Sequence, residues 1–140
     1  MILFCDTSAL VKLYVLEEGS DATLRQAEGC DAIAVCRIAF VELMSALARR
    51  AREQPQDQQA IERARQRFVA DWPDYLSLEV TQELVELAGD HADTFALRAY
   101  DSVQLAAVHL LHREVPGEVQ FACFDSRLAK AARALGIGSV

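Results

Sequence analysis

The sequence predicts an α/β fold, a three-layer α/β/α sandwich around a central, largely parallel sheet of four or five strands. Short apolar runs typical of buried strands alternate along the chain with longer stretches whose apolar residues recur at helical spacing. Such alternation is typical of a parallel sheet covered on both faces by helices. The 140 residues contain no repeat and no low-complexity segment, so we expect a single domain spanning residues 1–140.

The first half of the chain opens with an apolar run, residues 2–5, that stops at Asp6 and passes directly into a helical stretch. This order predicts a buried strand followed at once by a helix. Ser20 is the expected cap of a short helix that ends at Glu28. The other elements of this half are a second strand and two long helices that form a hairpin, over residues 32–36, 38–52 and 60–72.

The second half alternates in the same way. Apolar and polar residues alternate over 75–80, which predicts a third strand, and Thr81 caps the helix that follows. Asp93 and Thr94 open the next segment, and Gly136 ends the last helix. The remaining elements are helices over 82–91, 101–112 and 127–135, a fourth strand over 119–124, and the start of a fifth over 137–140.

Composition excludes several classes of protein. No apolar run approaches the roughly 20 residues of a membrane helix, and the N-terminus has no basic signal region. The four cysteines show no CxxC spacing, which favours reduced thiols over disulfides or a zinc site. His109 and His112 share a largely apolar helix without a Cys or a third His, which favours partial burial or surface exposure over a metal pair. We therefore expect a soluble cytoplasmic protein that does not bind a membrane.

Charge is distributed unevenly along the chain. The net charge of −7 argues against a simple polyanion-binding module. Residues 37–67 nevertheless hold seven arginines and four acids, whereas residues 71–93 hold seven acids and no Lys or Arg. Two interpretations stay open: the basic region contacts phosphates, or both regions are solvated helix faces.

Three acidic residues occur where a strand ends or a helix begins. Asp6 and Asp125 each follow an apolar strand and precede a helix, and Asp101 lies at the front of another helix. Each has an ordinary interpretation as a helix cap, and Gln104 gives Asp101 a pattern like a capping box. Strand-end acids of one parallel sheet nevertheless meet at the edge where such folds bind ligands. The alternatives are caps alone, or caps that also form a site.

Glu42 is harder to explain as a structural residue because its neighbours, from Ile38 to Met44, are almost all apolar. An unpartnered carboxylate there would cost on the order of several kcal/mol, so Glu42 needs a cation or a polar surface. Helical spacing offers such a surface, because a stripe continues through Ser45, Arg49 and Arg52. This stripe is either an exposed polar face or the wall of a cleft with Glu42 inside.

Convergence of these four carboxylates would raise their pKa values unless a cation is present. An all-oxygen donor set without nearby His or Cys selects Mg²⁺ or Mn²⁺ over zinc. Such sites activate water and stabilise charge on a phosphodiester. The pattern therefore predicts metal-dependent phosphoester hydrolysis, with catalytic and metal-binding acids at Asp6, Glu42, Asp101 and Asp125.

Four segments resemble, in order and spacing, the acidic motifs of PIN-domain proteins, and most closely those of VapC-type toxins of toxin–antitoxin systems. They are DTSALVKLY at 6–14, VELMSAL at 41–47, LRAYDSVQLA at 97–106 and FDSRLAKAA at 124–132. The resemblance implies a PIN-like fold and an RNA-cleaving nuclease that uses Mg²⁺ or Mn²⁺. It also implies a homodimer that a cognate antitoxin inhibits.

The resemblance assigns roles by position. The same four acids would hold the metal directly or through water, and the metal-bound water would attack the phosphate. Ser8 would support the acidic centre, and Arg98 would contact either the substrate or a neighbouring acid. One departure is Cys123, because many relatives carry Thr or Ser two residues before the fourth acid, and a thiol is a poorer donor. We expect RNA contacts from Arg49, Arg50 and Arg52.

The acidic pattern is compatible with two other functions. A receiver-like phosphoryl acceptor would need a lysine at a strand end, whereas Lys12 and Lys130 both lie in predicted helices. A catalytically silent PIN-like module that binds a protein partner is the main alternative to the nuclease. An apolar strip on the helical hairpin, drawn from Leu43, Leu47, Ile61, Phe68 and Val69, could receive an antitoxin helix or a second subunit.

Overall fold

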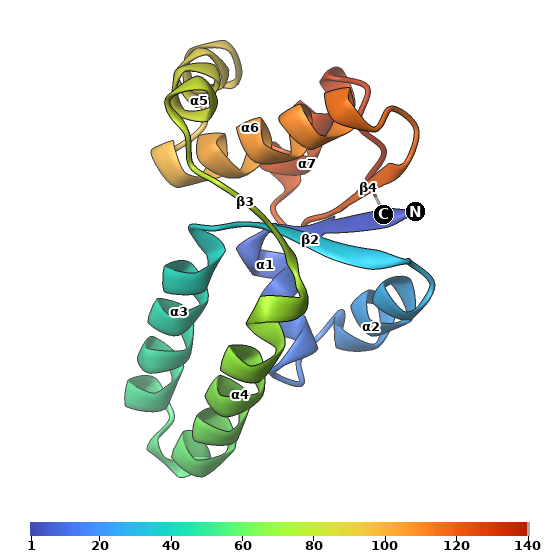
Figure 1. Ribbon diagram of the computed structural model, residues 1–140. Coiled ribbons are helices and arrows are strands. Elements are labelled where there is room, and N and C mark those ends of the chain that lie inside the picture. Colours follow the sequence, from blue (N-terminus) through green and yellow to red (C-terminus); the bar gives the residue numbers. More distant parts are fainter. Residues whose placement is uncertain (140) are drawn as a thin grey trace.

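The computed structural model describes residues 1–139, and they form the predicted α/β sandwich (Figure 1). The sheet contains β1 (Ile2–Cys5), β2 (Ala32–Cys36), β3 (Leu76–Leu78) and β4 (Val119–Ala122). Their order is β3-β2-β1-β4, and all pairings are parallel. The central, parallel sheet expected from the sequence is therefore confirmed with four strands.

Helices cover both faces of the sheet. In Figure 1, α5, α6 and α7 lie on one side, and α1, α2, α3 and α4 lie on the other. Their bounds are α1 Thr7–Leu10, α2 Ser20–Glu28, α3 Ala39–Glu53, α4 Gln58–Asp71, α5 Gln82–Phe95, α6 Ala99–Glu114 and α7 Ser126–Ala134. Short 3-10 turns extend α1, precede α4 and follow it, at Val11–Leu13, Pro55–Asp57 and Trp72–Asp74. Among the described residues, no helix is both long and apolar enough to cross a bilayer.

Strand periodicity divides the apolar residues between two cores. Phe4 and Phe121, on adjacent strands, belong to the core under α5, α6 and α7. Leu3 and Val35 point to the opposite face and join the core under the other helices. Both faces of a parallel sheet are buried in this way, which is why the strands read as continuous apolar runs.

The helical hairpin of α3 and α4 is anchored by aromatic packing. Phe68 lies within 5.5 Å, between ring centroids, of Tyr14, Phe40 and Trp72. Trp72 in turn meets Tyr75 edge to face. The ring of Trp72 thus fills a corner between α4 and β3. Of the apolar residues that we considered for a docking strip on this hairpin, Leu43, Leu47, Ile61 and Phe68 are buried in the core, and Val69 is 48% exposed.

Two expectations about helix ends were wrong. The helix predicted over 82–91 continues to Phe95, so Asp93 and Thr94 belong to its last turn and do not open the next segment. It ends at Ala96, which adopts a left-handed conformation with φ of 54°. Ser20 is the first residue of α2 and not its cap; its hydroxyl accepts from the Glu17 amide and donates to a backbone carbonyl instead.

The expected fifth strand is represented by a single parallel bridge between Phe121 and Ser139. Val140, the last residue of that expected strand, lies outside the described residues.

The order of the strands shows where this sheet would bind a ligand. The chain leaves β1 toward β2 and β3 and later returns to the other side of β1 as β4. The order reverses between β1 and β4, and such a switch point is where open α/β sheets bind ligands.

Candidate active site

Asp6 lies directly after β1 and is only 4% exposed. One oxygen, Oδ1, accepts from the Ala9 amide at 3.0 Å and from the Ser8 hydroxyl at 2.6 Å. Asp6 is therefore the N-cap of α1, as its ordinary interpretation predicted. Burial, and to a smaller extent the negative charge of Asp101, raise the pKa of Asp6, and the net value is about 6 despite those two hydrogen bonds. A cap alone does not require a buried carboxylate beside a second acid.

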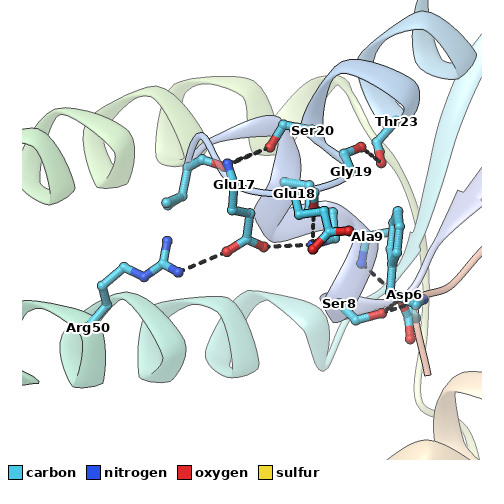
Figure 2. A network of polar contacts seen from close by, with 12 residues as sticks. Asp6, Ser8, Ala9, Glu17, Glu18, Gly19, Ser20, Thr23 and Arg50 are labelled. Carbon is cyan, nitrogen blue, oxygen red and sulfur yellow. Dashed lines mark hydrogen bonds and ion pairs between the residues drawn. The ribbon is translucent and has the colours of Figure 1, made fainter.

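Ser8 connects the ends of the two adjacent strands. Its hydroxyl donates to Asp6 and accepts from the Phe124 amide at 2.9 Å. Phe124 belongs to the loop between β4 and α7, so this one side chain fixes the spacing of the two loops at the switch point. The contact of Ser8 with Asp6 is visible in Figure 2.

Asp125 repeats the arrangement at the end of β4. Its Oδ1 accepts from the Leu128 amide at 2.9 Å and caps α7. The neighbouring Cys123 thiol donates to the Asp125 carbonyl at 3.4 Å. Burial, and then the nearby Asp6 charge, raise the pKa of Cys123, which keeps it a neutral thiol. The same thiol lies close to Asp6 and lowers the pKa of that carboxyl. Cys123 thus stands in place of a hydroxyl as a weaker donor.

Asp101 is not a helix cap. The N-cap of α6 is Arg98, and Asp101 lies inside the first turn, where its carboxylate is close to the N-terminal end of the helix dipole. Arg98 approaches Asp101 with its Nε 3.5 Å from Oδ2, although the arginine side chain is 85% exposed. The capping-box interpretation of Asp101 and Gln104 is thus wrong, because the Gln104 side chain turns into the protein.

Glu42 obtains its partners from two other elements. The Thr7 hydroxyl donates to Glu42 Oε1 at 2.9 Å, and Gln104 Nε2 donates to the same oxygen at 2.8 Å. Gln104 is 2% exposed, and its Oε1 finds no hydrogen-bond partner among the described residues. These contacts join α3 to the end of β1 and to α6. Sequence reasoning missed Thr7, and it assigned Gln104 to a cap.

Three of the four acids line hollows at the surface. Asp101 and Asp125 line a cleft of about 570 Å³ together with Arg98, Phe124, Ser126 and Arg127. Glu42 lines a smaller groove of about 310 Å³ with Val41, Ser45, Arg49 and Tyr100. The stripe from Glu42 to Arg49 thus lines a groove, and its members Ser45 and Arg49 are also exposed. Asp6 is buried and does not line the cleft, but it is near enough to Asp101 for that charge to affect its pKa.

The donor set suits a hard cation, because it consists of carboxylates at the switch point and includes the buried Asp6 with its raised pKa. In their present rotamers, the side chains of residues 1–139 do not bring three or more His, Cys, Asp or Glu ligands into a metal-holding group. Glu42 is held by Thr7 and Gln104, and Asp6 and Asp125 each use one oxygen as a cap. The acids thus have the right chemistry at one edge without a completed ligand cluster.

The three arginines that we expected to contact RNA differ in their surroundings. Arg49 lines the groove beside Glu42. Arg50 instead donates to Glu17 at 2.8 Å, an ion pair visible in Figure 2, and Glu17 also binds Lys12 at 3.0 Å. Arg52 is exposed near the end of α3. The geometry therefore favours Arg49 over Arg50 as a phosphate contact.

His109 and His112 do not form a pair. His109 Nδ1 lies 3.0 Å from Nε2 of His91, which joins α6 to α5. Burial lowers the pKa of both His91 and His109. Periodicity could not identify this contact, because the two residues lie on different helices.

Comparison with known proteins agrees with this fold. The fold and the acidic edge define a class, parallel α/β domains with carboxylates gathered at the switch point of the sheet. The sequence model of the PIN domain matches residues 3–134. The chain belongs to the PIN-domain family.

Relatives within the family are the VapC ribonucleases. Ribonuclease VapC45 and Ribonuclease VapC49, from two strains of Mycobacterium tuberculosis, are each 34% identical over 135 residues, which is 96% of this chain and 92% of theirs. Among solved structures, FitAcB from Neisseria gonorrhoeae matches with a TM-score of 0.70 at 14% identity, over 99% of this chain and 96% of that one. A toxin–antitoxin complex from Klebsiella pneumoniae matches with a TM-score of 0.67 at 19% identity, over 100% of this chain and 96% of that one. These structures support the fold.

Proposed function

We propose that this protein is a metal-dependent endoribonuclease and the toxin of a toxin–antitoxin pair. The observation that carries the proposal is the buried Asp6 at the switch point, near enough to Asp101 for that charge to raise its pKa, together with a cleft that Asp101 and Asp125 line. The related VapC ribonucleases support the reaction class, and the matching toxin–antitoxin complex suggests an antitoxin partner. RNA is the proposed substrate.

Mg²⁺ or Mn²⁺ is the proposed cofactor, held by Asp6, Asp101 and Asp125 with support from Glu42. When bound, such a cation would offset the charge of the acids and polarise a phosphate oxygen. The chain itself fixes the acids: Ser8 holds Asp6, whereas Thr7 and Gln104 hold Glu42. Arg98 and Arg127 line the cleft beside these carboxylates, where they can bind phosphates of the substrate.

Assembly and location complete the proposal. We infer a cognate antitoxin as the inhibiting partner, by analogy with the toxin–antitoxin complex that matches this fold. A homodimer is proposed from the family resemblance alone. The four cysteines are all free thiols, as is usual for proteins of the reducing cytoplasm, where RNA is also found.

The test is RNA cleavage by the purified, antitoxin-free protein in Mn²⁺, in Mg²⁺ and in excess EDTA. We expect metal-dependent cleavage that falls about 100-fold or more in Asp6→Asn, because a charged ligand of the centre is lost. Asp93→Asn is the matched control, because Asp93 is an exposed acid on α5 outside the cleft. Cleavage that survives Asp6→Asn would contradict the role of Asp6.

A protein that cuts no RNA would favour the silent PIN-like module. The melting temperature then shows whether such a module still binds metal. If it does, Mn²⁺ should raise the melting temperature of the wild type and leave that of Asp6→Asn unchanged. This alternative is favoured by the incomplete ligand group at the acidic edge of residues 1–139.

A further inference from the structure

Phe124 is an exposed aromatic ring on the wall of the acidic cleft. It lies between β4 and Asp125, is 51% exposed, and lines the cleft with Arg98, Asp101 and Arg127. The ring gains little from burial in this position, so packing alone does not explain it. The other residues that line the cleft are all charged or hydroxylic.

The ring is nevertheless held in place from behind. Lys12 Nζ lies 4.5 Å from the centroid of the Phe124 ring, and the same ammonium group is fixed by Glu17 and by the Glu18 carbonyl. Gly19 packs against the ring edge so closely that a Cβ atom there would lie 2.8 Å from Cε1. A cation–π contact and a close backbone approach thus fix one side of the ring.

The backbone of Phe124 is also tied to the acidic centre. Its amide donates to Ser8 Oγ, and the Ser8 hydroxyl donates to Asp6. The ring therefore lies at a defined position relative to Asp6 and Asp125. A fixed, half-exposed aromatic ring beside a cluster of acids and arginines suits a ligand that has both a flat π-face and a phosphate.

We propose that Phe124 is a base-stacking subsite for a nucleotide next to the cleaved phosphodiester. The inference rests on the proposed ribonuclease function and specifies the form of its substrate. The base of the nucleotide would stack on Phe124, and its phosphate would bind the arginines of the cleft. A flat apolar protein surface fits less well, because it would bury Arg98, Asp101, Asp125 and Arg127 without partners.

Stacking requires a base that is free of its own neighbours. A base in an RNA helix has both faces covered, whereas an unpaired base can turn onto an aromatic side chain. The subsite therefore selects single-stranded RNA or the loop of a folded RNA over duplex RNA.

The experiment measures RNA binding by Phe124→Leu, which keeps an apolar side chain and removes the ring. Binding is measured in the Asp6→Asn background with short single-stranded RNA of random sequence, and with the same length of abasic RNA. We expect Phe124→Leu to weaken binding of the intact RNA by about 5- to 150-fold, the range for one lost base stack. The affinity for abasic RNA should be unchanged, and Phe124→Tyr should restore the affinity for intact RNA.

Two further variants sharpen the test. Gly19→Ala should displace the ring and weaken binding in the same direction, although the ring itself is retained. Val69→Ala is the control, because Val69 is an exposed apolar residue on α4 outside the cleft and should bind RNA like its parent. Melting temperatures show that each variant is folded.

Several results would overturn the subsite. Equal affinity of Phe124→Leu and its parent for intact RNA would do so, as would an equal loss with abasic RNA, which would indicate a contact with the backbone. A change in self-association or antitoxin binding without a change in RNA affinity would assign the ring to a protein contact. If the wild type cleaves RNA and Phe124→Leu has an unchanged KM, only this inference fails. If the wild type neither cleaves nor binds RNA, the proposed function fails with it.

Discussion

At the scale of single residues, Asp6 combines two roles that sequence patterns present as alternatives. It is a helix cap, and it is also a buried carboxylate with a raised pKa. A cap uses one oxygen and is satisfied by a neutral amide as well as by a charge. The charge of Asp6 is therefore unnecessary for the fold and destabilises it when no cation is present.

This destabilisation predicts how stability depends on pH. The folded protein favours protonated Asp6, because its pKa of about 6 lies above the ordinary value near 4. The stabilisation from this group is complete below about pH 4 and is lost as the pH rises through about 6. In EDTA at pH 7.5, the free energy of unfolding of Asp6→Asn should therefore exceed that of the wild type by on the order of 1–3 kcal/mol.

Urea unfolding at pH 4 and at pH 7.5 checks this prediction, with Asp93→Asn as the exposed control. The difference between Asp6→Asn and wild type should close at pH 4. A wild type as stable as Asp6→Asn at pH 7.5 would mean that the buried charge is already compensated by groups of the protein itself.

Gln104 shows how a buried polar residue can be misread at this scale. Its position three residues after Asp101 is typical of a capping box, yet its amide donates to Glu42 and to Thr7. Both partners lie on other elements of the fold. Gln104 therefore positions a carboxylate of the proposed site, although nothing in its local sequence indicates this.

At the scale of elements, α5 and α6 are joined by the hydrogen bond between His91 and His109. One imidazole must be neutral so that its unprotonated nitrogen accepts the hydrogen bond from the other. Burial lowers the pKa of both, so their contribution to stability is present above their ordinary value near 6.5 and is lost as the pH falls below it. This effect is opposite in sign to that of Asp6.

Replacement of one histidine should separate the two effects. Glutamine at position 109 can still hydrogen-bond His91 but does not titrate, so His109→Gln should lose less stability than the wild type between pH 7 and pH 5. Urea unfolding at both pH values measures this, and His112→Gln is the control on the same helix. Identical pH profiles for His109→Gln and wild type would show that the histidine pair does not control this stability.

At the scale of the whole molecule, an RNA substrate must approach a protein with a net charge of −7. The arginines that can meet it are those whose side chains lack an internal partner or line a groove. Arg49 lines the groove beside Glu42, whereas Arg50 is engaged by Glu17. The basic stretch of the sequence is thus divided between a surface role and a structural one.

This division predicts different salt dependences for neighbouring arginines. Arg49→Gln should weaken RNA binding and reduce the slope of log K against log salt by about 0.7, the value for one phosphate contact on a single strand. Arg50→Gln, the matched control, should leave the slope unchanged, because Arg50 pairs with Glu17. Titrations of RNA binding at several salt concentrations measure both slopes. An unchanged slope in Arg49→Gln would remove Arg49 from the RNA-binding surface.

The sequence by itself determined the class of fold and the edge of the sheet where Asp6 and Asp125 lie. Both follow from local signals: apolar runs of strand length, helical spacing between them, and acids placed directly after two strands. Parallel strands necessarily end at the same edge, so the order of residues is enough to bring these two acids together. Helix ends were less certain; the helix that begins at Gln82 runs past Gly89 to Phe95, because a lone glycine weakens a helix without ending it.

Only the tertiary structure decided which side chains surround those acids. Glu42 meets Gln104, 62 residues away, and Phe124 receives Lys12 and Gly19 at its ring. These contacts depend on how α3, α6 and the β4–α7 loop pack against β1, and the period of one helix carries no information about its neighbour. The local sequence pattern therefore places the carboxylates at the edge of the sheet. Long-range packing determines which residues hydrogen-bond them and places Phe124 on the wall of the cleft.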